Sequence, residues 1–73
     1  MKRTELLKSL RKLARANMTE VTVVREGGAH TVYRCGPAQF TVPRHTEINE
    51  NTARGILRHV GDALAGEQDE QVR

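Results

Sequence analysis

The spacing of apolar residues changes twice along this 73-residue chain, and that change restricts the possible folds more than any other feature. In residues 4–16 apolar side chains recur three and four residues apart, as at Leu6, Leu10 and Leu13, which is the period of a helix. Between residues 19 and 42 the period is two, which is typical of strands. After residue 49 the helical period returns, for example at Ile56 and Val60. The chain is therefore predicted to run helix, strands, helix.

Two turn signals divide the middle of the chain into three strands, over residues 19–26, 30–35 and 39–42. The turns are Gly27-Gly28 and Gly36-Pro37. Strands joined by links this short are expected to pair antiparallel, as neighbours in one sheet. The pattern leaves open which of Val32 and Tyr33 faces the helices.

The predicted fold is α+β with the order α-β-β-β-α, in which two helices pack on one face of a three-stranded antiparallel sheet. Double-stranded-RNA-binding domains have this arrangement. Thr4 and Asn49 are the expected N-caps, and the second helix is expected to end at Gly61 or to continue to Ala65. One domain is predicted over residues 1–65, followed by a disordered polar tail over 66–73. The residues expected to be substantially buried are Leu10, Leu13, Val23, Phe40, Ile56, Leu57 and Val60.

The charge of the chain favours a polyanionic partner. The formal net charge is +3, and residues 1–65 hold eleven basic against six acidic side chains. The first helix has a basic side opposite its apolar one, which is either an ordinary solvated face or a ridge facing the phosphates of RNA. That basic ridge consists of Lys8, Arg11, Lys12 and Arg15.

The single cysteine, Cys35, excludes an internal disulfide and fits a reducing compartment. No 18-residue apolar run is present, so neither a membrane span nor a membrane partner is expected. The sequence therefore predicts a cytoplasmic protein.

Several enzyme classes are excluded because their motifs are absent. The sequence has no CxxC pair, no HExxH and no GxxxxGK[ST] loop, and its carboxylates are scattered singly. Two-metal nucleases need clustered carboxylates. A nuclease with this composition is therefore expected to need no metal and no other cofactor.

Histidine remains as the side chain suited to proton transfer at neutral pH, and the chain has three. His59 lies inside the second predicted helix, where exposure or partial burial explains it. His45 lies in a loop after Pro43-Arg44, where a phosphate contact is the expected role. His30 follows the glycine turn and opens a strand, with Val32 and Arg34 on the same strand face. From the residues alone, a polar residue at a strand edge and a catalytic group are both open interpretations of His30.

Three short segments resemble the HicA toxin family. Residues 25–30, Arg-Glu-Gly-Gly-Ala-His, look like its Gly-x-His signature, and residues 42–45, Val-Pro-Arg-His, resemble its Val-Pro-x-His stretch. Residues 52–57 are similar to the opening of its final helix, and the amino-terminal Lys-Arg-x-Glu-Leu-Leu also fits. The resemblance covers roughly residues 2 to 61. One departure is Ala29, where many members have serine.

The resemblance implies a double-stranded-RNA-binding-like fold, ribosome-independent cleavage of mRNA, and a HicB-like antitoxin protein as partner. The family's catalytic histidine corresponds to His30. RNA contacts are then expected from Gly28, Arg34, Arg44 and His45, in addition to the basic ridge.

The expected reaction starts with neutral His30 taking the proton of a ribose 2′-OH, which attacks the adjacent phosphate; direct attack by water is the alternative. Arg34 and Arg44 are the candidates for stabilising the transition state, and water or His45 for protonating the leaving oxygen. Rival functions are a non-catalytic RNA-binding module and a DNA-binding or purely protein-binding domain.

Overall fold

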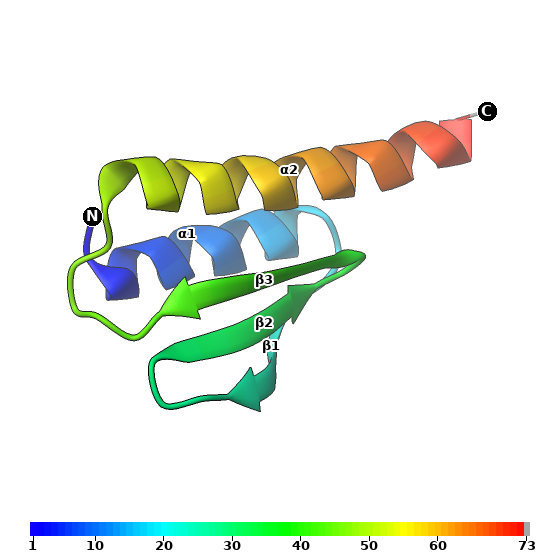
Figure 1. Ribbon diagram of the computed structural model, residues 1–73. Coiled ribbons are helices and arrows are strands. Elements are labelled where there is room, and N and C mark those ends of the chain that lie inside the picture. The colour runs from blue at the N-terminus through cyan, green and yellow to red at the C-terminus, as the bar shows by residue number, and fades with distance from the viewer. Residues whose placement is uncertain (73) are drawn as a thin grey trace.

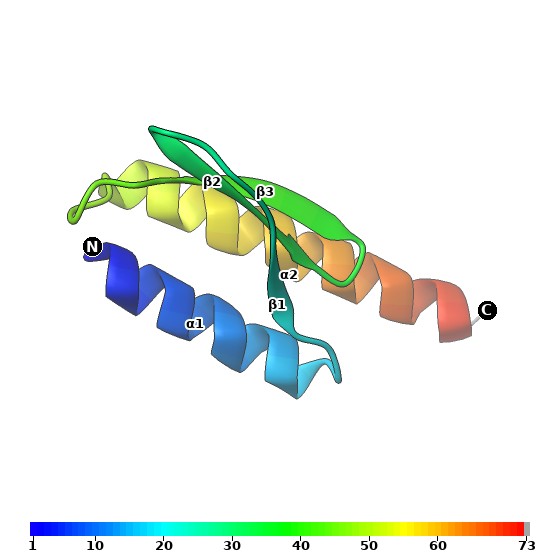
Figure 2. The ribbon, with the colours of Figure 1, turned by 90° about the horizontal axis from the view of Figure 1, so that it is seen from below.

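The computed structural model describes the backbone of residues 1–72 and the side chains of residues 1–66. Its elements are helix α1 (Arg3–Ala16), strands β1 (Val21–Glu26), β2 (His30–Cys35) and β3 (Ala38–Pro43), and helix α2 (Glu50–Val72). The strands form one antiparallel sheet in the order β1-β2-β3. Both helices lie on the same side of this sheet (Figure 1 and Figure 2). The predicted α-β-β-β-α fold is confirmed.

The two faces of the sheet differ because residues alternate along each strand. On β2 and β3 the residues that face the helices are buried, and those between them are mostly exposed. The Tyr33 and Phe40 rings stack on the covered face with their centroids 5.8 Å apart. Tyr33, rather than Val32, therefore faces the helices. The buried apolar side chains are Leu6, Leu7, Leu10, Ala14, Tyr33, Cys35, Ala38, Phe40, Val42, Ile48, Ala53, Val60 and Leu64.

Burial matches the prediction except at Val23. Leu10, Phe40 and Val60 are buried, and Leu13, Ile56 and Leu57 are partly buried against the core, but Val23 is 55% exposed. Val23 pairs with Tyr33, so it lies on the helix side of the sheet. However, α1 covers only the beginning of β1 (Figure 2). The prediction that Val23 is buried is wrong because alternation identifies a face and does not reveal whether a helix covers it.

The first helix begins earlier than predicted, with Lys2 rather than Thr4 at the N-cap position. Lys2 forms an isolated antiparallel bridge with Glu47, and the Arg3 amide donates to the Thr46 carbonyl at 2.9 Å. These contacts tie the start of α1 to the loop after β3. The early start of the helix is therefore a tertiary effect that local capping preferences do not predict.

The second helix begins as predicted. The amide of Asn51 donates to Oδ1 of Asn49 at 2.8 Å, which is an N-cap bond. The helix continues past both Gly61 and Ala65 and ends at Val72. The tail was predicted over residues 66–73. Because the side chains of residues 67–73 lie outside the described residues, the disorder of this tail stays a prediction.

The turns are as tight as the glycines suggest. Cys35 pairs with Ala38 across the two-residue link Gly36-Pro37. Gly36 has φ +59°, the left-handed value that a type II′ hairpin turn needs at its first central position. This hairpin fixes the register of β2 on β3, and with it the residue opposite His30.

Candidate functional site

His30 is held by its backbone, while its ring is exposed to solvent. It opens β2, it pairs with Pro43 of β3, and its carbonyl accepts a hydrogen bond from the Gly27 amide at 2.8 Å. No described residue forms a hydrogen bond or ion pair with the imidazole. A fixed backbone with an unpaired, exposed ring is the arrangement that a proton-transfer group needs to meet a substrate.

Arg44 lies next to the turn that precedes His30. Its amide donates to the Ala29 carbonyl at 3.0 Å, and its Nη1 donates to the Gly27 carbonyl at 3.2 Å. These two bonds fasten the end of β3 to the glycine turn. A guanidinium has five N–H donors, so Arg44 keeps donors for an anion beside His30.

The loop after β3 is also anchored by the start of the chain. The terminal amine of Met1 donates to the Ile48 carbonyl at 3.0 Å, and the Ile48 amide donates to the Met1 carbonyl at 2.7 Å. His45 is exposed in this loop, two residues beyond the partner of His30. Since consecutive Cα atoms are ~3.8 Å apart, His45 lies at the same end of the sheet as His30. The structure therefore places Gly28, His30, Arg44 and His45 at the same end of the sheet.

Arg34 is on the same open face as His30 but is not part of that group. It is exposed on β2, opposite Gln39. Four residues along a strand separate the Cα atoms of Arg34 and His30 by about 13 Å. Arg34 is therefore placed to contact a different phosphate from the one beside His30, if RNA lies along this face.

The basic ridge belongs to the other layer of the molecule. Its four side chains are exposed on α1, which packs against the sheet face opposite to His30, and together they line a shallow hollow. None of the ion pairs within the described residues involves them. The chain thus carries two separate basic regions, the ridge and the end of the sheet at His30.

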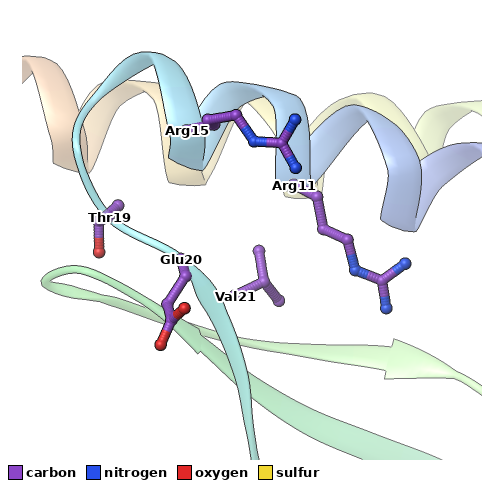
Figure 3. A pocket seen from close by; sticks show the side chains of 5 residues that line it. All are labelled: Arg11, Arg15, Thr19, Glu20 and Val21. Atoms are coloured by element: carbon purple, nitrogen blue, oxygen red, sulfur yellow. The ribbon is translucent and has the colours of Figure 1, made fainter.

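A groove that the sequence did not suggest lies between the ridge and β1. Arg11, Arg15, Thr19, Glu20 and Val21 line it, and Figure 3 shows the arginine side chains extending from α1 beside the start of β1. The sequence gives little indication of this groove. Its residues come from two elements, and the periodicity of each element does not determine how the two pack together.

Two further groups are explained by the fold. The Nε2 of His59 lies 3.3 Å from the Gln39 carbonyl, so this histidine joins α2 to β3. Cys35 is fully buried, and this burial raises the pKa of its thiol, which favours the unreactive protonated form. Neither residue is a candidate for chemistry.

The comparisons with known proteins add no relative: no family model, no curated protein and no solved structure matches this chain. The resemblance to HicA toxins thus depends on the short motifs around His30, His45 and the start of α2.

Metal-binding clusters and membrane spans are the other features that bear on function. Within the part of the chain that the structure describes, no three His, Cys, Asp or Glu side chains form a group that could hold a metal ion. Of the described helices, none is long and apolar enough to cross a membrane.

Proposed function

We propose that this chain is an endoribonuclease of the HicA toxin type, which cuts mRNA without a metal ion and uses His30 as its catalytic residue. The observation that carries the proposal is the surroundings of His30: an exposed imidazole without a partner among the described residues, at a turn to which the Arg44 guanidinium is hydrogen-bonded. The α-β-β-β-α fold supports it, since double-stranded-RNA-binding domains share that arrangement.

In the proposed reaction neutral His30 takes the proton of a ribose 2′-OH. The 2′ oxygen then forms a bond to the adjacent phosphorus, and the bond from phosphorus to the 5′ oxygen breaks. The leaving oxygen takes a proton from water or from His45. Arg44 stabilises the negative charge of the transition state, where preorganised donors contribute most. Direct attack by water on the same phosphate is the alternative route, with His30 as its base.

RNA binding is assigned to the basic residues outside the immediate site. The basic ridge supplies four unpaired cations for phosphates, and Arg34 supplies one on the open face. Gly28 has no atom within 4 Å of the position of an added Cβ, so a ligand can approach the turn closely. Such binding is expected to weaken steeply with salt.

The same proposal includes a HicB-like antitoxin that covers His30. A ribonuclease with an exposed catalytic group needs control from outside, and a basic surface attracts an acidic partner. The free thiol of Cys35 and the need to meet mRNA support a cytoplasmic location.

A specific observation favours one second candidate, an RNA-binding module without catalysis. The basic ridge and His30 lie in different layers, so binding by the ridge does not by itself bring a phosphate to the imidazole. One assay separates the two functions: pure protein is incubated with RNA and with DNA of matched sequence, each with and without EDTA. Cleavage of RNA alone that survives EDTA supports the ribonuclease. Binding without cleavage supports the module, and cleavage of both nucleic acids contradicts the proposed use of the 2′-OH.

A further inference from the structure

The two edges of the sheet differ in whether their outward backbone groups are hydrogen-bonded. Because the closing pair of a two-residue hairpin exchanges hydrogen bonds, Cys35 pairs with Ala38 in this way, and hydrogen-bonded pairs then alternate along β2 and β3. Gln39, Thr41 and Pro43 therefore turn their backbone groups away from β2, towards the free edge of β3.

The edge of β3 is partly closed by side chains of other elements. The Gln39 carbonyl is within hydrogen-bond distance of Nε2 of His59, and the Pro43 carbonyl accepts a bond from Nε of Arg3 at 3.2 Å. Proline also has no N–H to offer. This edge therefore offers few free backbone N–H and C=O groups for pairing with another strand.

The edge of β1 is open. By the same alternation His30, Val32 and Arg34 bond towards β1, where their partners are Gly27, Arg25 and Thr22. The backbone groups of Val21, Val23 and Glu26 consequently point outwards. No hydrogen bond from any described residue reaches them. The register also shifts between Val23 and Arg25, which leaves Val24 without a partner on β2.

Exposed apolar side chains occur on β1 and in the loop that precedes it. Among the side chains that the structure describes, the large apolar ones that are exposed are Met18, Val23 and Val24, at 96%, 55% and 49%. Met18 also has φ +60°, a left-handed conformation in which glycine is the usual residue. The backbone of Met18 caps the end of α1, where its amide donates to the Arg15 carbonyl at 3.2 Å, but its exposed side chain adds nothing to the core.

The positive charge beside the β1 edge indicates what kind of partner can bind there. The groove along the start of β1 contains Arg11 and Arg15, with Glu20 as its acidic member, and the remaining cations of the basic ridge are adjacent. A second copy has a basic ridge of its own, so it offers Arg11 and Arg15 less negative charge than an acidic segment does. Nucleic acid would use the cations but not the apolar side chains or the backbone donors and acceptors. An acidic polypeptide in extended form uses all three.

We propose that the open edge of β1 binds an extended acidic segment of a partner protein as a fourth strand. Main-chain hydrogen bonds to Val21, Val23 and Glu26 supply the pairing, and alternate side chains supply selectivity, as in other strand additions. Acidic side chains face Arg11 and Arg15 on the helix side of the sheet, and the apolar side chains that alternate with them lie on the other face, next to Val24. The proposal is independent of the proposed function, since a strand can bind here whether or not His30 cuts RNA.

The test uses the full chain and a labelled peptide of alternating Glu and Val, followed by fluorescence anisotropy at low salt. Val23→Pro removes an outward N–H from the open edge, so binding should weaken by about ten-fold. Thr41→Pro is the matched control on the closed edge and should leave peptide affinity unchanged. The double variant Arg11→Glu, Arg15→Glu should also lose about ten-fold, whereas Arg58→Glu on α2 should not.

Amide NMR shifts then locate the peptide. The largest changes are expected at Val21, Val23 and Glu26. No binding at millimolar peptide, equal binding of a Lys-Val peptide, or equal losses in Val23→Pro and Thr41→Pro would overturn the proposal. Amide shifts at Val21, Val23 and Glu26 on addition of a short RNA, without peptide, would assign the edge to RNA instead. A concentration-dependent dimer by sedimentation, with no peptide binding, would assign it to a second copy.

Discussion

The two faces of the sheet come from the same strands yet have opposite compositions. On the covered face Tyr33, Phe40 and Val42 are buried beneath the helices. On the open face His30 and Arg34 are exposed. The alternation of side chains along a strand produces this division at no cost in length, which matters in a 73-residue chain with a thin core. Stability and the proposed chemistry therefore depend on different residues, and substitutions should separate them.

The largest expected effect on stability is on the covered face. Phe40→Ala removes a buried ring that stacks on Tyr33, and such truncations cost about 3–5 kcal/mol. The intrinsic stability of a domain this small is only about 3–5 kcal/mol, so the variant should be mostly unfolded at 25 °C. Thr41→Ala, the exposed neighbour on the open face, should change the free energy of unfolding by less than about 0.5 kcal/mol. Urea titration followed by circular dichroism measures both, and similar losses in the two variants would refute the division between faces.

Next comes a test of whether RNA binding belongs to the helix layer. The double variant Lys8→Gln, Lys12→Gln should lower RNA affinity and reduce the slope of log K against log salt by about 0.7–0.9 for each phosphate that these lysines neutralise. The cleavage rate of fully bound RNA should not change, since the ridge does not reach His30. Arg58→Gln, whose partner is Asp62, is the control. An unchanged salt slope would show that the ridge is only a solvated face.

Smaller effects are expected at the end of α1 and at the turn between β2 and β3. In the Schellman motif at the end of α1, the amide of Thr19 donates to the Ala14 carbonyl and Met18 takes the place usually held by glycine. Met18→Gly should therefore stabilise the fold by up to about 1 kcal/mol. Gly36→Ala should do the reverse, because φ is +59° there and a Cβ would lie 3.1 Å from Cδ2 of Leu64. Thermal unfolding measures both, and shifts of the same sign would contradict this account of the turns.

The smallest effect concerns Thr31, the neighbour of His30 on the covered face. It is 1% exposed, and its Oγ1 is the one buried side-chain polar atom without a hydrogen-bond partner among the described residues. Replacing Thr31 with valine should stabilise the protein by roughly 0.5–1 kcal/mol, because an unpaired buried hydroxyl costs free energy. Cleavage should be unchanged. A loss of stability, read from the urea midpoint, would mean that the hydroxyl has a partner in solution.

Periodicity was sufficient to predict the order of elements and which strand residues share a face, but not which face the helices cover. The alternation from His30 to Arg34 identified their shared side, and the glycine turns identified the strand ends. What periodicity could not supply was the extent of helix coverage, which is why Val23 was wrongly placed in the core. Whether α2 would stop at Gly61 was also beyond local signals, because a single glycine costs a helix only about 1 kcal/mol.

The site shows the same limit. Gly28, His30, Arg44 and His45 were singled out by type and by motif, but their grouping depends on contacts distant in sequence. Arg44 reaches Gly27 across 17 residues, and Met1 reaches Ile48 across 47. Such bonds follow from the packed fold and have no signature in either segment alone. The basic ridge and His30 are likewise separated because α1 packs on the sheet face opposite to His30, which neither segment shows alone.

The most direct measurement of the central claim is the rate of RNA cleavage in EDTA by the wild-type chain, His30→Ala and His45→Ala, with the fold of each checked by circular dichroism. The account predicts a loss of about 10²–10⁴-fold for His30→Ala, the usual contribution of general acid–base catalysis. Its stability and RNA affinity should stay close to those of the wild type, because His30 is exposed and most phosphate contacts are proposed for the ridge. Full activity in His30→Ala together with loss of cleavage in His45→Ala would contradict the choice of histidine. Cleavage that disappears in EDTA for the wild type would contradict the metal-independent mechanism itself.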